Sequence, residues 1–288
     1  MKRGCVKRSK FEFMNGISTD RGMPPGLRSE TPTDDRPSSI DLPKNPTVSS
    51  TPRSRTYERG VSICIPAFNE QETIETSIIT AAQTLQQTGL PGEILVIDDC
   101  STDATWRIME RLAVDVSGLR IRRHDRNRGI AETFMELYEW ARMDLVFLNS
   151  ADGQWKMGIL LDMLPSIKGF DLVVARRKQK HYGGGRLLVS WLFNVAPLLM
   201  FWTRTHDAGS VKLVRREIYD IPIQSRGVFA EAERIIRADR RGYRIGAVDV
   251  EHFERLSGKA SGAKPFLVCE AIADLMKCWV SIVLLRRA

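Results

Sequence analysis

The chain has 288 residues, 43% of them hydrophobic, which is enough for a sizeable core in one large domain or two smaller ones. The formal net charge is +8, and most of the excess lies in residues 1–59, together with seven of the thirteen prolines. This segment has no sustained apolar period and is predicted to be a basic, weakly ordered arm. A solvated tail is favoured over contact with anionic lipid, no nucleic-acid partner is expected, and no secretory signal is expected.

The five cysteines show neither a CxxC pair nor a metal-ligand spacing. Cys64 and Cys100 sit with the apolar residues of predicted strands, where a reduced thiol behaves as a small hydrophobic side chain. This usage favours a reducing compartment.

From Val61 onward, short β-rich apolar runs alternate with segments of helical spacing. The predicted strands are residues 61–65, 93–97, 119–122, 144–148 and 171–175. The predicted helices are residues 70–87, 102–112, 129–141 and 157–164. This alternation predicts right-handed crossovers and a mostly parallel sheet flanked by helices. Ligands bind such sheets beyond the carboxyl ends of the strands.

Two more apolar segments lie in the second half of the chain. Residues 187–202 contain Asn194 and Pro197 and are predicted to form a buried or membrane-facing helix. Residues 266–285 have the length of a membrane span, but Glu270, Asp274 and Lys277 interrupt them, and charges are costly in hydrocarbon. An amphipathic helix, packed on the domain or lying on a bilayer surface, is predicted instead.

Polar residues follow every predicted strand, at positions 66–70, 98–103, 125–129, 149–154 and 176–177. Each set has a structural explanation: Asn69, Ser101 or Thr102 could cap a helix, and Asp98 with Asp99 could form a solvated turn. Together, however, they place carboxylates at two strand ends and basic or amide groups at two others, as a nucleotide with its metal and phosphates would require. Neither a P-loop nor a Rossmann glycine motif is present.

The motifs VSICIPAFNEQETI, ILVIDDCSTDAT, RNRGIAETF and FLNSADGQW, in this order, resemble the nucleotide-binding half of family 2 glycosyltransferases. The resemblance covers about residues 61–265. It implies an α/β GT-A fold, a mostly parallel sheet flanked by helices with a Rossmann-like nucleotide-binding half. The expected regions are a basic arm at 1–59, a GT-A domain at 60–265 and an amphipathic, membrane-associated helix at 266–288.

The same resemblance implies site residues for a nucleotide-sugar donor. The nucleobase and ribose pocket would be lined by Pro66, Phe68, Glu70 and Asp98 and shaped by Asp99 and Gly129. Asp152 would be the second acid of the family's D-x-D motif and would hold Mg or Mn against the diphosphate. Ser150 stands where the first acid is expected, which makes weaker or absent metal dependence an open alternative.

The later motifs resemble polyprenol-phosphate glycosyltransferases of the dolichol-phosphate mannose synthase type. VARRKQKHYGGGR carries Arg177, HDAGSVKLVRRE carries Asp207, Ser210 and Lys212, and FERLSGKAS carries Arg255, Gly258, Lys259 and Ser261. The expected roles are catalysis for Asp152, Gln154, Arg177 and Arg255, and phosphate binding for Lys212, Lys259 and Ser261.

The acceptor follows from the chemistry at a helix start. A hydroxyl acceptor needs a general base, which relatives supply as an E-D pair, whereas FAEAE offers Glu231 and Glu233 without such a pair. A phosphate acceptor is already an anion and needs cations instead. The sequence therefore predicts an inverting transferase that moves a hexose from a nucleotide sugar to polyprenyl phosphate, in the cytoplasm, peripheral on the inner membrane face. Two alternatives stay open: a hydroxyl acceptor with Glu231 or Glu233 as base, and a catalytically impaired nucleotide-binding protein.

Overall fold

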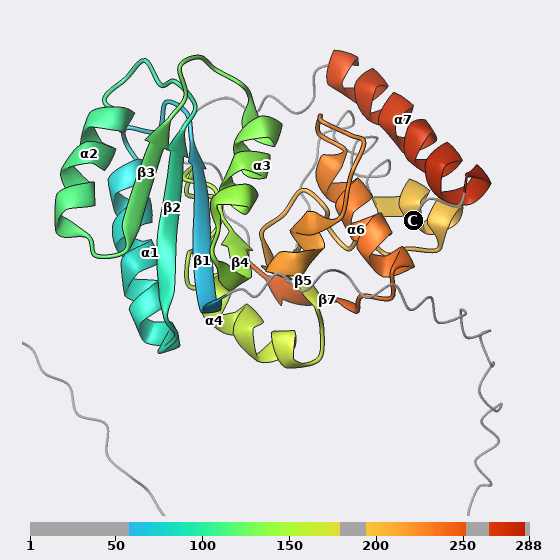
Figure 1. Ribbon diagram of the computed structural model, residues 1–288, viewed down its shortest axis with the longest axis horizontal. Coiled ribbons are helices and arrows are strands. Elements are labelled where there is room, and N and C mark those ends of the chain that lie inside the picture. The colour runs from blue at the N-terminus through green and yellow to red at the C-terminus, as the bar shows by residue number, and fades with distance from the viewer. Residues whose placement is uncertain (1–57, 179–193, 252–264, 286–288) are drawn as a thin grey trace, which may run out of the picture. The chain divides into compact units, whose positions relative to one another are not determined.

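The computed structural model describes residues 58–178, 194–251 and 265–285, which contain one seven-stranded sheet of order β3-β2-β1-β4-β6-β5-β7 (Figure 1). The strands are β1 (Glu58–Ala67), β2 (Gly92–Asp98), β3 (Leu119–Arg123), β4 (Met143–Leu148), β5 (Leu172–Arg177), β6 (Lys212–Arg215) and β7 (Ile245–Val250). The helices are α1 (Ile74–Thr88), α2 (Thr105–Asp115), α3 (Ile130–Trp140), α4 (Ile159–Met163), α6 (Ala230–Arg240) and α7 (Pro265–Trp279). The single-turn elements are η1 (Leu164–Lys168), η2 (Arg216–Asp220) and η3 (Val280–Leu284).

The sheet is mostly parallel, as the alternating pattern predicted. β1 pairs in parallel with β2 and β4, β2 with β3, and β5 with β7. The exception is β6, which lies antiparallel between β4 and β5 and was not among the predicted strands. Its insertion separates β4 from β5, so the two halves of the sheet are joined through a reversed strand.

Alternation along the strands divides the core between the two faces of the sheet. Ile63 and Ile65 of β1 pack with α1, α2 and α4, whereas Cys64 between them packs with α3, α6 and α7. Both faces are covered by helices, which explains why the strands read as continuous apolar runs rather than as alternating patterns.

Several predicted helices begin later or end earlier than their pattern suggested. α1 begins at Ile74 and α2 at Thr105, because the residues before them form turns. The helix predicted over 157–164 is a short α4 followed by the 3₁₀ turn η1, which has Pro165 near its start. The shortened helices leave longer strand-end loops, and these loops build the site.

The C-terminal helix is amphipathic and packs on the domain. Ala271, Leu275, Cys278 and Ile282 recur at helical spacing and belong to the buried cluster that also contains α3 and α6 residues. The described part of the other apolar segment, residues 194–201, is helical and contributes Ala196 and Phe201 to that cluster.

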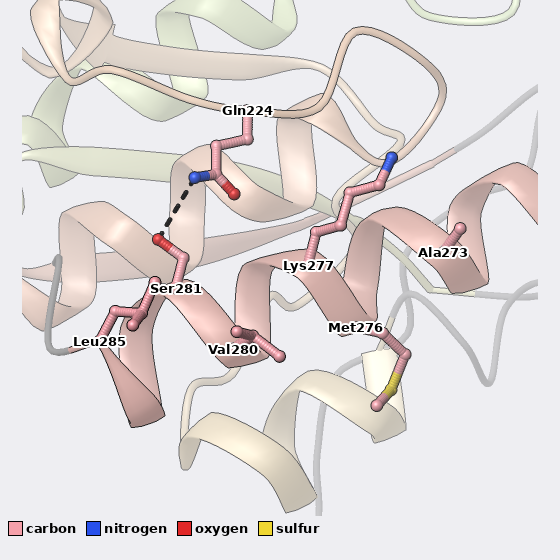
Figure 2. A pocket seen from close by; sticks show the side chains of 7 residues that line it. All are labelled: Gln224, Ala273, Met276, Lys277, Val280, Ser281 and Leu285. Carbon is pink, nitrogen blue, oxygen red and sulfur yellow. Dashed lines mark hydrogen bonds between the residues drawn. The ribbon is translucent and has the colours of Figure 1, made fainter.

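The outward face of α7 is apolar as well. Ile272 and Met276 are 45% and 47% exposed, and Val280 and Leu284 continue this face along η3. A shallow groove on it is lined by Gln224, Ala273, Met276, Lys277, Val280, Ser281 and Leu285 (Figure 2). Within the described ranges, no helix combines the length and the apolarity needed to cross a bilayer.

Candidate active site

The strand register brings the predicted site residues to one edge of the sheet. Ala67 at the end of β1 pairs with Asp98 at the end of β2, and Asp98 pairs with Arg123 at the end of β3. On the other side, Leu148 of β4 pairs with Lys212 of β6, because the antiparallel β6 begins where its neighbours end. The loops after four parallel strands and the loop before β6 therefore meet at this edge (Figure 1).

Asp98 and Asp99 do not form a solvated turn, because both side chains are buried. Oδ1 of Asp98 accepts the backbone N–H and the hydroxyl of Ser101. Its Oδ2 lies 3.1 Å from Nε of Arg123 but, among the described residues, has no partner in hydrogen-bond geometry. A buried carboxylate oxygen in this state is well suited to accept a hydrogen bond from a ligand.

The carboxylate of Asp99 holds the loop that follows β3. Oδ1 accepts the backbone N–H of Arg128 at 2.7 Å, and Oδ2 accepts that of Gly129 at 2.8 Å. Gly129 has a φ of 87°, a left-handed conformation that residues with a side chain rarely adopt. Asp99 therefore fixes the shape of this loop.

Asn69, Ser101 and Thr102 do not cap helices. The N-cap residues of α1 and α2 are Thr73 and Ala104, neither with a side-chain cap bond. Instead, the backbone N–H of Asn69 donates to Oγ of Ser101, and Oδ1 of Asn69 accepts the N–H of Thr102, each at 2.8 Å. These bonds brace the loop after β1 against the loop after β2.

The other predicted pocket residues lie at the end of β1 and on the braced loop that follows it. Pro66 is buried within β1, Phe68 is 45% exposed, and Glu70 is half-buried. The backbone N–H of Glu70 donates to Oγ1 of Thr105, and its carboxylate accepts the hydroxyl of Thr73. Phe68 follows Ala67, which pairs with Asp98, and an exposed aromatic ring on a braced loop can stack against a planar ring.

Asp152 lies in a tight turn after β4 and is 5% exposed. Its Oδ1 accepts the hydroxyl of Ser150 at 2.5 Å and the backbone N–H of Gln154 at 3.1 Å. Gly153 has a φ of 71°, so the glycine allows the sharp turn that brings the three residues together. Ser150 therefore remains beside Asp152 as an oxygen-bearing neighbour, although it lacks the negative charge of the expected acid.

Arg177 at the end of β5 forms a bidentate ion pair with Asp207, with Nε–Oδ2 and Nη2–Oδ1 distances of 2.7 and 2.9 Å. Its guanidinium also lies 5.6 Å from the ring centre of Trp155, next to the Asp152 turn. The preceding Arg176 instead pairs with Asp249 of β7, in an exposed position. The structure thus brings together Arg177 and Asp207, which the sequence had placed in separate motifs.

Lys212 lies in a buried charge network rather than at an open surface. It is 2% exposed, and its Nζ donates to the carbonyl oxygen of Ser210 at 2.9 Å and lies 3.3 Å from Oε2 of Glu231. Oε1 of Glu231 lies 3.7 Å from Nε of buried Arg234. Burial raises the pKa of Glu231, but the charges of Lys212 and Arg234 outweigh it, so the pKa lies below its usual value.

Glu233 is fully buried and has a structural role. Its carboxylate accepts the backbone N–H groups of Gln224 and Ser225 and a hydrogen bond from Nε of Arg237 at 2.7 Å. Burial raises its pKa, but these bonds outweigh it, and the pKa is lowered. A buried carboxylate with these partners is a poor general base.

Three predicted residues, Arg255, Lys259 and Ser261, lie outside the described residues, as does most of the predicted basic arm. Conversely, the structure adds His124 and Arg123, which the sequence reasoning did not select. The strand-end residues considered after β3 began at Asp125, two positions too late to include both of them. The available signal was their position directly after the apolar residues of the predicted strand, since ligands bind beyond the carboxyl ends of such strands.

The comparisons with known proteins agree with this geometry. The model of the family described as "Glycosyl transferase family 2" matches residues 62–221, more than half of the chain, and the chain belongs to that family. By class it is a glycosyltransferase, as the sequence motifs predicted.

Among curated proteins, the chain is 23% identical over 228 residues to an undecaprenyl-phosphate mannosyltransferase of Micrococcus luteus, covering 74% of this chain and 91% of the relative. It is also 29% identical over 134 residues to a dolichol-phosphate mannosyltransferase of Pyrococcus furiosus, covering 46% of this chain. That match spans only 36% of the archaeal protein's length.

Solved structures share the fold. Mannosyl-3-phosphoglycerate synthase from Rubrobacter xylanophilus superposes with a TM-score of 0.60 at 19% identity, covering 80% of this chain and 76% of that one. Glucosyl-3-phosphoglycerate synthase from Mycobacterium tuberculosis, in complex with Mn²⁺, uridine diphosphate and phosphoglyceric acid, gives a TM-score of 0.58 at 22% identity, covering 77% and 78%. The predicted α/β fold of the GT-A type is confirmed.

Proposed function

We propose that this protein transfers a hexose from a nucleoside-diphosphate sugar to a polyprenyl phosphate at the cytoplasmic face of the membrane. The observation that carries the proposal is the state of the two acids at the start of α6. Glu231 forms ion pairs with Lys212 and Arg234, and Glu233 is buried and accepts a hydrogen bond from Arg237. Because the pKa values of Glu231 and Glu233 are both lowered, neither carboxylate is suited to deprotonate a hydroxyl. A phosphate nucleophile needs no base.

The donor would bind across the braced loops after β1, β2 and β3. Phe68 offers an exposed ring for the nucleobase, and the buried Oδ2 of Asp98 is available to a base or ribose donor group. Pro66 lies near the end of β1, Glu70 lies in the loop that follows, and Asp99 sets the position of Gly129. Backbone amides of such a loop can approach a ligand closely where glycine leaves out the side chain.

A divalent cation would be held at Asp152. The donor set fits a hard cation, since a buried carboxylate and the Ser150 hydroxyl supply oxygen ligands and the donor diphosphate supplies more. Among the described residues, no group of three or more acidic, histidine or cysteine side chains is arranged for a metal, so the cation would depend on the diphosphate. When bound, it would neutralise charge on the leaving diphosphate; the Mn²⁺ in the mycobacterial complex supports Mn or Mg in this role.

The acceptor phosphate would lie between Arg177 and Gln154. A phosphate oxygen attacks the anomeric carbon, the bond from that carbon to the diphosphate breaks, and no proton has to be removed. Arg177 is held by Asp207 and faces Trp155, so its position is fixed before substrate arrives. Lys212 is assigned a different role from the predicted phosphate contact, since its buried amine fixes Glu231. Arg255, Lys259 and Ser261 remain predictions.

The apolar face of α7 supports a membrane-bound acceptor. Ile272, Met276 and Leu284 are exposed on it, and the groove in Figure 2 has Lys277 at its rim. Exposed apolar side chains with a basic residue beside them are typical of helices that lie on an anionic membrane surface. The names of the bacterial and archaeal relatives, which act on undecaprenyl and dolichol phosphate, support the same acceptor class.

The proposal is tested by incubating the protein with radiolabelled UDP- and GDP-hexoses and Mg²⁺ or Mn²⁺. One arm contains polyprenyl phosphate in vesicles, one contains the matching polyprenol, and one contains 3-phosphoglycerate. Transfer to the lipid phosphate alone is expected. Transfer to the polyprenol would establish a hydroxyl acceptor, and transfer to phosphoglycerate would contradict a lipid acceptor. Nucleotide binding without transfer to any acceptor would favour the impaired protein that Ser150 suggests.

A further inference from the structure

His124 is a buried histidine held between two carboxylates. It directly follows β3 and is 4% exposed. Its Nδ1 lies 2.7 Å from Oδ1 of Asp99, and its Nε2 lies 3.0 Å from Oε2 of Glu136 on α3. Its backbone N–H donates to the carbonyl oxygen of Asp98 at 2.9 Å. The ring therefore links the end of β2 to a helix that begins beyond the next loop.

Other charged groups surround this arrangement. Arg122 of β3 lies 3.2 Å from Glu136, and Arg128 lies 3.6 Å from the same carboxylate and 3.1 Å from Asp125. Both arginines carry fixed positive charge across the accessible pH range, so a change of pH does not alter their contribution. Imidazole is the side-chain type in this cluster that can be either neutral or positively charged in the physiological pH range.

The protonation state decides how many bonds the ring can make. A neutral imidazole has one N–H donor and one acceptor nitrogen, whereas an imidazolium has two donors. Two ionised carboxylates can only accept, so bonding both at once requires the imidazolium. When the proton leaves, a nitrogen lone pair faces a carboxylate, and one of the two contacts is lost.

The contact to Asp99 matters because the same carboxylate shapes the loop after β3. It receives the amides of Arg128 and Gly129, and Gly129 directly precedes α3, which carries Glu136. In Figure 1 this loop runs from the tip of β3 to the start of α3. His124 thus closes a ring of contacts from Asp99 through the loop and along α3 to Glu136.

We propose that His124 is a positioning residue: as an imidazolium it clamps Asp99 to Glu136, holds the loop at 125–129 in its binding shape, and makes donor affinity fall as pH rises. This inference rests on the proposed function, in which that loop borders the donor nucleotide. The ligand class is a nucleoside diphosphate with its cation.

The first test measures binding of UDP and of GDP with Mg²⁺ by calorimetry at about pH 6.5 and about pH 8.5. We expect binding by the parent to weaken about tenfold over this range, the cost of losing one charged hydrogen bond. Glu136→Gln should remove this dependence and keep the higher affinity, because a glutamine amide can donate to a neutral ring that still donates to Asp99. The nucleotide affinity of His124→Asn should also be independent of pH, but it should equal the weaker affinity that the parent shows at high pH.

Glu139→Gln is the matched control, since Glu139 is exposed on the same helix. Glu139→Gln should show the same dependence of affinity on pH as the parent, because it leaves His124 and Glu136 unchanged. Protonation of the nucleotide itself affects the parent and the three variants equally. An identical pH dependence in the parent, Glu136→Gln and His124→Asn would overturn the clamp.

The second test does not depend on nucleotide binding. Two-bond ¹H–¹⁵N NMR spectra report whether each ring nitrogen of His124 is protonated, and the amide signals of Arg128 and Gly129 report the loop. We expect both nitrogens to be protonated at the low end of the range and the two amides to shift with the same midpoint as the ring. A neutral His124 ring at the low end of the pH range would contradict the inference. Amide signals of Arg128 and Gly129 that do not shift when the ring titrates would contradict it as well. If the parent binds no nucleotide while the NMR result holds, the proposed function fails and the clamp itself stands.

Discussion

The two halves of the site edge use their acidic side chains differently. After β1, β2 and β3, the acids mainly accept hydrogen bonds from backbone amides and hydroxyls: Asp98 from Ser101, and Asp99 from Arg128 and Gly129. Around β5, β6 and α6, the acids pair with cations: Asp207 with Arg177, and Glu231 with Lys212. The first half is therefore organised to present a fixed loop shape, and the second to fix the positions of charged groups.

This difference indicates which changes should affect chemistry and which should affect folding. Where an acid holds backbone amides, its removal should loosen a loop and weaken ligand binding. Where an acid holds a cation, its removal should leave a charge without its partner, and the result depends on whether that cation is buried. Asp152 lies between the two halves: it accepts the backbone N–H of Gln154, and it is also the proposed cation ligand.

The largest effect is expected at Asp152. Asp152→Asn should reduce transfer by a hundredfold or more, about 3 kcal/mol of transition-state stabilisation, because the diphosphate loses its cation anchor. Initial rates with the folded variant, checked by circular dichroism, measure this. Ser150→Asp is the complementary change and should tighten Mn²⁺ binding. Turnover of Asp152→Asn within a few-fold of the parent would remove this residue from the site.

The next effect compares two neighbouring arginines. Arg177→Ala should reduce transfer by about a hundredfold, since a positioned cation is lost beside the reacting phosphates. Arg176→Ala is the matched control and should change the rate little, because Arg176 is paired with Asp249 in an exposed position away from the proposed phosphate contact. Equal losses in both variants would mean that the second half binds phosphate through general surface charge.

The acids of α6 should affect stability more than chemistry. Glu233→Gln should lower the free energy of unfolding by about 3 kcal/mol, because buried Arg237 loses its charged partner. Denaturant titration measures this, and transfer by the folded fraction of Glu233→Gln or Glu231→Gln should stay within a few-fold of the parent. A folded but inactive Glu231→Gln would instead indicate a hydroxyl acceptor.

The same acids predict how stability depends on pH. Their pKa values are lowered in the folded state, so their contribution is present near neutral pH and is lost as pH falls through the lowered values. The parent should therefore lose more stability on acidification than the double variant Glu231→Gln/Glu233→Gln. Unfolding curves at a series of acidic pH values provide the comparison, and parallel losses would contradict it.

The smallest effect is expected at the loop after β3. Gly129→Ala should cost about 1 to 2 kcal/mol, because the left-handed backbone at this position disfavours a side chain although space is available. If the first half works through loop shape, nucleotide affinity should fall together with stability. A loss of stability with unchanged nucleotide affinity would show that the loop after β3 does not contribute to donor binding.

The sequence alone determined the alternation of strands and helices, the parallel sheet and the strand ends at which Asp98 and Asp152 lie. These features are predictable because they depend on local periodicity and on the rule that ligands bind beyond the carboxyl ends of parallel strands. The motif order was sufficient to predict the family.

Only the tertiary structure decided how the charged groups pair. The antiparallel insertion of β6 places Lys212 beside Glu231, and the bidentate pair joins Arg177 to Asp207 across thirty positions of the chain. The buried state of Asp98 and Asp99 and the position of His124 between Asp99 and Glu136 likewise depend on which loops meet. Such pairings are set by long-range register and packing, whereas the local pattern at each of these residues is equally compatible with a solvated turn or an exposed charge.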